Sequence, residues 1–539
     1  MHNTKPSSLP QLVESLLKNH DTKDVDVGVI WQALRNALAP KAMIDNLAEA
    51  LRVPAQDIER DLAGLGFSDI VALARLNARE SETQTKGDES AVTPCTDPSV
   101  LCPFPHLFRV SAAPDFTEPI PLPKAEKEAF DDLVKAVAAN SASDEFVKLY
   151  RHNVPGYFDA FMASDGKRID RFLAERFAGG RPRYLVTTGI GANEQFTHFP
   201  GSINNENPDR RVTWLRVNST SKLTRLPEDA TVDNTLFMEF SRSGVTEETV
   251  KIHEYTPRAA HRMVFANQGP LREIGERDGD LVLPLPDQVS GRFGRNTAPI
   301  LLAPMYVAGM DVASFWKAIQ VAIDTFDLAD PDSLPMVMAK FMYLSQQGGP
   351  RNLIYLGCND AQLGYLADEF VQFWNEGVNK GGNDLIVSSF FGLPRDSHMN
   401  IEGILGNRDT KMGVFLIRTQ MRAEPSHPLL LGTIDAINPE HDGLRLGDEE
   451  VILAFANYER FAELMPTVLI EVPGAPRLEL AAVLGQLLTD LTYLYSRLKN
   501  IDPGSNPEVK AVRDRSEHLL AEVAGRVRNG QPIDQAIHE

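Results

Sequence analysis

The sequence predicts an α/β protein with two doubly wound parallel-sheet lobes and covering helices. Short apolar runs rich in β-branched residues alternate with helical stretches, first over residues 125–330 and then again over 331–500. Strands of this kind, separated by helices, are typical of parallel sheets that are covered on both faces. Two such units of similar size predict a two-lobed enzyme with its site between the lobes.

The individual strands are predicted from the short apolar runs. The first lobe is predicted to hold strands at 184–188, 212–217, 236–240, 263–266 and 281–285. The second lobe is predicted to hold strands at 353–357, 385–390, 414–417, 451–455 and 468–472. Longer apolar or amphipathic stretches predict helices at 299–323, 475–499 and 507–528.

Residues 1–80 are predicted to form a small α-helical domain. Apolar residues recur at helical spacing over 47–67, with a break near Pro54, in a pattern similar to a helix-turn-helix head. The second helix of that pair would carry Asp57 and Glu59, and acidic side chains repel the DNA backbone. A helical oligomerisation or docking module is therefore favoured over a DNA-binding one.

Two further segments complete the predicted organisation. Residues 81–124 are first polar and then rich in proline, which predicts a linker, part of it lying on the main domain. Residues 501–539 are predicted to form a C-terminal helical arm.

The composition restricts the class of function. The net charge of −20 argues against a broad nucleic-acid surface, although a phosphate pocket needs only local positive charge. We find no apolar run long enough for a membrane span, and the N-terminus lacks an apolar signal region. The 3 cysteines form no C-x-x-C pair, so we expect a cytoplasmic location.

The clearest chemical signal lies in residues 236–250, which predict a strand, a tight loop and a helix N-terminus. Such a loop directs free backbone N–H groups and the positive end of a helix dipole at one point. Four side chains add hydroxyl donors or positive charge, which would suit a phosphate: Ser241, Arg242, Ser243 and Thr246. Neither the Walker pattern nor the dinucleotide fingerprint is present there. An ordinary Ser/Thr-capped helix is the alternative interpretation.

Two glycine-containing turns are further candidates. Residues 188–193 form the first strand-to-helix turn, where Gly191 would permit a close ligand approach. Arg292 follows a glycine ahead of a helix, which suits contact with an anion or oxyanion, unless it is a surface arginine.

Two acid–base candidates come from the second lobe. Glu376 lies beside Trp374 where an apolar helix ends, and a partly buried carboxylate can serve as a general base. His398 follows a loop after a strand, with Asp396 near enough to orient it, and histidine can transfer protons near neutral pH. A solvated glutamate and a structural histidine are the alternatives.

In their order along the chain, these motifs resemble the glucose-6-phosphate isomerase family, whose members have a double sugar-isomerase (SIS) domain. The resemblance covers residues from about 125 to 520. The stretches that carry it are 189–193, 241–246, 290–293, 372–380, 396–398 and 501–513.

The resemblance implies a role for each matched position. Ser241, Arg242, Ser243 and Thr246 would hold the sugar phosphate, and three positions would line the substrate site: Gly191, Asn193 and Gln372. Arg292 would stabilise the enediolate, and Glu376 would move the proton between C1 and C2. His398 would help to open the sugar ring and would come from the other subunit of a homodimer. No metal or organic cofactor is required for this chemistry.

The sequence departs from the family pattern at several of these positions. The catalytic lysine near the family's C-terminus aligns with Arg513, and arginine scarcely releases a proton. Lys510, one helical turn away, is a possible substitute. Asn193 stands at a family serine, and Ser397 stands at the glutamine before the family histidine. These changes fit an altered substrate preference better than a loss of chemistry.

The sequence therefore predicts a sugar-phosphate aldose–ketose isomerase that interconverts glucose 6-phosphate and fructose 6-phosphate through an enediol. One alternative is an isomerase of another hexose phosphate. The other is a non-catalytic regulator that senses a sugar phosphate, which would use the helices of residues 1–80.

Overall fold

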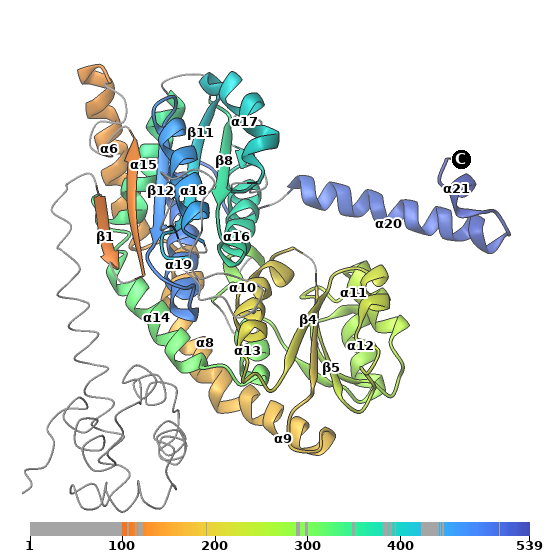
Figure 1. Ribbon diagram of the computed structural model, residues 1–539. Helices are drawn as coiled ribbons and strands as arrows, with labels where there is room; N and C mark the ends of the chain where they lie inside the picture. Colours follow the sequence, from red (N-terminus) through yellow and green to blue (C-terminus); the bar gives the residue numbers. More distant parts are fainter. Residues whose placement is uncertain are drawn as a thin grey trace, which may run out of the picture. The chain divides into compact units, whose positions relative to one another are not determined.

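The computed structural model describes residues 100–538 with short gaps (Figure 1). The gaps are residues 105–106, 114–115, 117–121, 190, 287–290, 297–299, 348–350, 381–385, 388–390, 394, 422–440, 442–443, 445–446 and 506. The helical domain predicted for residues 1–80 lies outside the described residues.

The first lobe contains a sheet of five parallel strands. In chain order they are β3 (Tyr184–Thr188), β4 (Thr213–Val217), β5 (Thr235–Phe240), β6 (His261–Phe265) and β7 (Leu281–Leu283). The spatial order is β4-β3-β5-β6-β7. Three helices connect the strands: α10 (Ala192–Glu206), α11 (Glu247–Tyr255) and α12 (Gly269–Asp278). Every residue of β3 and β5 is buried, as expected for central strands covered on both faces.

The second lobe repeats this arrangement. Its parallel strands are β8 (Leu353–Cys358), β9 (Ile386–Val387), β10 (Phe391–Gly392), β11 (Lys411–Arg418) and β12 (Thr467–Val472). They are joined through α16 (Ala361–Gly377), α17 (Ser397–Gly406) and α18 (Asp448–Ala462). The short β9 and β10 pair with one side of β8, and β11 followed by β12 lies on the other. In both lobes the first strand is therefore internal: β3 lies between β4 and β5, and β8 lies between β11 on one side and β9 and β10 on the other.

An antiparallel hairpin extends the second sheet. β1 (Val100–Phe104) pairs with β2 (Phe108–Ala113), and β2 pairs antiparallel with β12, with Val110 opposite Ile470. These strands lie within the stretch 81–124 that the proline content marks as a linker. Phe108 and Val110 are fully buried, so this segment lies on the main domain and contributes to its core.

Three elements differ from the sequence prediction. The apolar run 451–455 is helical within α18, whose first turn carries Asp448, Glu449 and Glu450, as the helix dipole favours. Only Ile386 and Val387 of the predicted strand 385–390 pair with a neighbour among the described residues. The predicted helix 299–323 is two helices, α13 (Leu302–Ala308) and α14 (Val312–Thr325), because Gly309 adopts a left-handed conformation with φ of 78°.

The remaining helices and turns complete the described chain. The α-helices are α6 (Lys124–Ser141), α7 (Glu145–Val147), α8 (Val154–Ala160), α9 (Gly166–Arg176), α15 (Leu334–Gln347), α19 (Leu478–Leu498), α20 (Pro507–Arg528) and α21 (Ile533–Ala536). The 3-10 or π segments are η1 (Lys148–His152), η2 (Phe161–Asp165), η3 (Thr220–Arg225), η4 (Gly291–Gly294) and η5 (Arg408–Thr410). No described helix is both long and apolar enough to cross a membrane.

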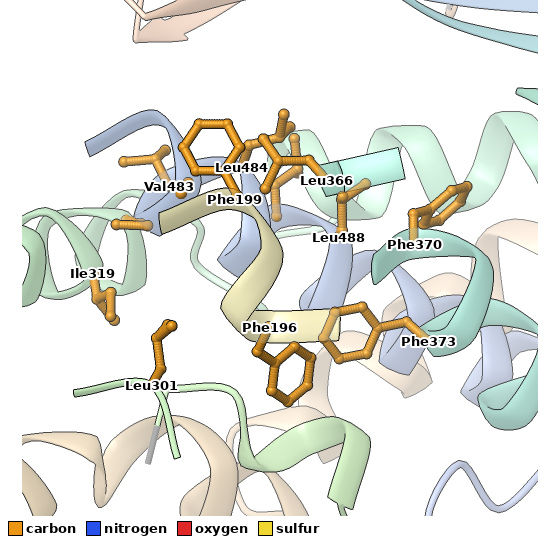
Figure 2. Close-up of a cluster of buried hydrophobic side chains, with 14 of the residues drawn as sticks. Phe196, Phe199, Leu301, Ile319, Leu366, Phe370, Phe373, Val483, Leu484 and Leu488 are labelled. Carbon is orange, nitrogen blue, oxygen red and sulfur yellow. The ribbon is translucent and has the colours of Figure 1, made fainter. Parts of the chain in front are cut away.

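A shared apolar core joins helices from the two lobes (Figure 2). Phe196 of α10 stacks on Phe373 of α16, with ring centroids 5.6 Å apart. Leu484 and Leu488 of α19 belong to the same buried cluster. At the end of α16, a Cβ on Gly377 would lie 2.7 Å from Cγ2 of Thr492, so glycine permits the close approach of α19. This packing holds α16, which carries Glu376, in place.

Candidate active site

The first sheet has its topological switch point between β3 and β5. The chain leaves β3 through α10 toward β4 on one side, whereas β5 leads to β6 and β7 on the other. Because β3 and β5 are parallel neighbours, with Thr188 opposite Glu239, their carboxyl ends lie at the same edge. Gly191 and Ser241 follow these two ends directly. Ligands of doubly wound sheets bind at such a crevice.

The loop after β5 is closed by its own hydroxyl groups. The Oγ of Ser241 lies 2.8 Å from Oγ1 of Thr246 and also accepts a hydrogen bond from the Thr246 N–H at 3.3 Å. The Gly244 N–H donates to the Ser241 carbonyl at 2.9 Å. Ser241 is buried, whereas Arg242, Ser243 and Thr246 are half-buried at the rim. The loop therefore ends in a narrow turn at the start of α11, as the sequence predicts.

A second loop braces this turn. Gly244 has φ of 68°, and a Cβ there would lie only 1.9 Å from the Gln268 carbonyl oxygen. Gly269 has φ of 80°, and its Cβ would lie 2.5 Å from the Ser243 carbonyl oxygen. The Asn267 N–H donates to the Arg242 carbonyl at 3.1 Å. Two glycines thus let two backbone segments cross in contact, which sets the path of the loop.

A polar cluster connects the Gly191 turn with α16. Gly191 has φ of 66°, and a Cβ there would lie 2.9 Å from Nε2 of Gln372. The same Nε2 donates to Oε1 of Glu376 at 2.9 Å, one helical turn further along α16. The other carboxylate oxygen of Glu376 accepts a hydrogen bond from Nη1 of Arg292 at 3.1 Å. The structure therefore brings together four of the predicted site residues, from both lobes.

Arg292 is almost fully buried within η4. Its side chain is 2% exposed, against 26% for Glu376, so the carboxylate retains access to solvent. Nη2 donates to the Ser505 carbonyl at 2.6 Å, and Nε has no hydrogen-bond partner among the described residues. Burial lowers the pKa of Arg292, and Glu376 and Asp502 oppose that shift. The cation is held in position by the protein, which suits the stabilisation of a developing oxyanion.

Lys380 is a further cation of this cluster. Its Nζ donates to the Asp502 carbonyl oxygen, three residues before the carbonyl that binds Arg292. Burial and, to a smaller extent, Arg292 lower the pKa of Lys380 to about 8, while Asp502 and Glu376 act in the opposite direction. Lys380 is the last residue of the motif 372–380, and the resemblance implies no role for it.

A second ion pair lies next to the pair of Arg292 and Glu376 along the sequence. Nε of Arg295 donates to Oε2 of Glu369 at 2.6 Å, and both side chains are essentially inaccessible to solvent. Arg295 lies three residues after Arg292, and Glu369 lies seven residues, or two helical turns, before Glu376. A Cβ on Gly485 would lie 2.3 Å from Arg295, so α19 leaves room for the guanidinium. This pair connects the residue that follows η4 to α16, at a second point.

The backbone positions of the other predicted residues are clear. Asn193 is the second residue of α10. Lys510 lies in the first turn of α20 and Arg513 lies in the second. His398 is the second residue of α17, after Asp396, whose carboxylate accepts hydrogen bonds from Arg395 and the Gly392 N–H. The structure does not describe four side chains of this set: those of Asn193, His398, Lys510 and Arg513.

The chain is similar to known proteins at low sequence identity. No protein-family model matches the chain. A protein of Haloarcula marismortui named probable glucose-6-phosphate isomerase is 24% identical over 421 residues, which cover 74% of this chain and 91% of that protein.

Solved structures show the same fold. A hypothetical protein from Thermus thermophilus has a TM-score of 0.60 at 19% identity, over 76% of this chain and 100% of that one. A glucose-6-phosphate isomerase from Chlamydia trachomatis has a TM-score of 0.56 at 12% identity, over 80% of this chain and 91% of that one. The chain is therefore similar in sequence to a protein named probable glucose-6-phosphate isomerase, and its two lobes have the sugar-isomerase (SIS) fold.

Proposed function

We propose that this protein is a sugar-phosphate aldose–ketose isomerase that interconverts glucose 6-phosphate and fructose 6-phosphate. The observation that carries the proposal is the contact of the Glu376 carboxylate with both Gln372 and the buried Arg292, beside the Gly191 turn. Two of the three proteins named above bear the name of this activity, and the order of motifs along the chain agrees with it.

Glu376 would act as the base that moves the carbon-bound proton. Aldose–ketose exchange needs one group that removes a proton from C2 and returns it to C1, or the reverse. A carboxylate with two oxygens and partial solvent access can serve both carbons. Gln372 orients one of these oxygens through its hydrogen bond of 2.9 Å.

Arg292 would stabilise the enediolate formed between the two proton transfers. Its guanidinium is already oriented by Ser505 and Glu376, so little reorganisation is needed when negative charge develops on the substrate oxygens. Arginine also remains charged throughout, because a guanidinium scarcely gives up its proton in proteins.

The loop 241–246 would hold the sugar phosphate. Its backbone N–H groups lie at the start of α11, where the positive end of the helix dipole favours an anion. Arg242, Ser243 and Thr246 stand at the rim of the loop and would donate to the phosphate oxygens.

The proposal also includes several roles that the resemblance to the family implies. His398 would transfer a proton during ring opening, as a residue of the second subunit in a homodimer. Asn193 would line the sugar, and its difference from the family serine leaves another hexose phosphate as the second candidate substrate. We also propose a cytoplasmic location, from the cysteine usage.

A coupled assay tests the proposal directly. The purified chain is expected to convert fructose 6-phosphate to glucose 6-phosphate, and Glu376→Gln is expected to lower kcat by roughly 10²–10⁴-fold. The variant should still show a rise in melting temperature with fructose 6-phosphate, because the phosphate loop is intact. Glu463→Gln, which alters an exposed ion pair with Arg460, is the matched control and should retain full activity. Absence of turnover in the unmodified chain would refute the proposal.

A further inference from the structure

Isomerisation of a hexose phosphate begins with opening of the sugar ring, and this step places a demand on the site. The hydroxyl on C1 must lose a proton, and the ring oxygen must gain one. Glu376 is assigned to the carbon-bound proton, and arginines scarcely exchange protons near neutral pH. The resemblance described above aligns the family's C-terminal lysine with Arg513, which is also an arginine. A group that can give and take a proton on oxygen is therefore needed.

Lys380 lies near Arg292 and Glu376, the two residues proposed to act on C1 and C2 of the substrate. Its backbone N–H donates to the Val378 carbonyl at 2.8 Å, just after α16 ends, which turns the chain toward the segment 501–505. Its Nζ then donates to the Asp502 carbonyl, while Arg292 donates to the Ser505 carbonyl. Both cations are thus held by the same short segment, and both act electrostatically on each other and on Glu376.

The surroundings of Lys380 suit proton exchange. The charged groups that influence it are Arg292 from η4, Glu376 from α16 and Asp502 from the segment 501–505. Burial and the neighbouring guanidinium disfavour the ammonium form and bring the pKa to about 8. An amine with this pKa exchanges between its two forms near neutral pH, which an ordinary surface lysine does not.

We propose that Lys380 is a second acid–base residue of this site and transfers the proton of the substrate's anomeric hydroxyl during ring opening. The neutral Nζ accepts the proton of the C1 hydroxyl, and the C1=O bond forms. The electron pair of the C1–O5 bond passes to O5, which takes up a proton from the acid on its other side, the role proposed above for His398. Ring closure reverses each step. This inference rests on the proposed function.

Anomer exchange separates Lys380 from Glu376, because anomerisation opens and closes the ring without moving a carbon-bound proton. Two-dimensional exchange NMR measures α–β interconversion of glucose 6-phosphate, and solvent deuterium incorporation at C2 measures the Glu376 step. We expect Glu376→Gln to keep anomerisation and to lose deuterium incorporation. We expect Lys380→Met and Lys380→Arg to lower the anomerisation rate by roughly 10²-fold or more.

The pH dependence adds a second test. The anomerisation rate of the unmodified enzyme should rise with pH and level off above about 8, because Nζ of Lys380 loses its proton there. This rise should be absent from the Lys380→Arg variant. Lys380→Arg keeps the positive charge and a donor toward Asp502, so it serves if Lys380→Met does not fold. Lys340→Met is the matched control, because Nζ of Lys340 also donates to a backbone carbonyl, that of Pro331 at 2.8 Å, but on α15.

The outcomes distinguish this inference from the proposed function. An enzyme that isomerises fructose 6-phosphate, but whose Lys380→Arg variant anomerises at the unmodified rate with an unchanged pH profile, overturns the role of Lys380 alone. An unmodified chain that neither isomerises nor anomerises the substrate overturns both. Loss of anomerisation in both Lys380 variants, with Lys340→Met unaffected, establishes the role.

Discussion

The two lobes share a strand order but differ at the point where that order reverses. In the first lobe, the strands on either side of the switch point, β3 and β5, are followed by the Gly191 turn and the loop that begins at Ser241. In the second lobe, the corresponding strands are β8, which is followed by Asn359, and β11, which ends at Arg418. Topology makes the two positions equivalent, but their side chains differ.

The second switch point is filled by the protein's own groups. Arg418 Nη1 donates to Oδ2 of Asp360 at 2.8 Å, and the Asn359 side chain exchanges hydrogen bonds of 2.8 and 3.0 Å with the Arg418 backbone. The other oxygen of Asp360 caps α16 through the Gln362 N–H at 2.8 Å. The first lobe thus places small residues and hydroxyls at its crevice, whereas the second uses its crevice to anchor the helix that carries Glu376.

The largest expected effect is at Gly244. Gly244→Ala should destabilise the protein by more than about 2 kcal/mol and abolish activity, because alanine is strained at φ of 68° and its Cβ would meet the Gln268 carbonyl. Gly156→Ala is the control, since no atom lies within 4 Å of its Cβ, and a gain of up to about 1 kcal/mol is expected. Denaturant unfolding and the coupled assay measure both effects. A stable, active Gly244→Ala variant would contradict the crossing of the two loops.

Breaking the ion pair of the second lobe should affect stability alone. Arg418→Met leaves the Asp360 carboxylate, which is 7% exposed, without its partner, and should lower the free energy of unfolding by about 2–3 kcal/mol. This is less than for a fully buried pair because the Arg418 side chain is 23% exposed. Arg460→Met, in an exposed pair, should cost less than about 1 kcal/mol. A large rise in KM for Arg418→Met would show that the second crevice also binds substrate.

Removing a hydroxyl from the first switch point should mainly weaken substrate binding, with a smaller loss of stability. Ser241→Ala removes the group that holds Thr246 and should raise KM for fructose 6-phosphate roughly 10-fold, with a stability loss of about 1 kcal/mol. Asn359→Ala at the equivalent place in the second lobe should leave KM unchanged and lower only stability. Equal changes of KM in the two variants would remove the distinction between the lobes.

Much of the first switch point was predictable because its signals are local. An apolar run, small hydroxyl residues, one glycine and a polar helix start predict strand, loop and helix without reference to the rest of the chain, and 236–250 folds in this way. The long amphipathic runs at 475–499 and 507–528 likewise form α19 and α20. The strand predicted at 451–455 is wrong because a short apolar stretch has no periodicity that distinguishes a strand from a helix.

The sequence by itself determined the α/β class, the order of the lobes and the identity of the residues Gly191, Arg292, Gln372 and Glu376 as candidates. The tertiary structure alone decided which of them meet and what else joins them. Arg292 reaches Glu376 because α16 packs against α10 and α19, and the pKa of Lys380 is lowered because the fold buries this side chain near Arg292. Proximity and burial depend on packing between segments far apart in the chain, and local patterns carry no record of either.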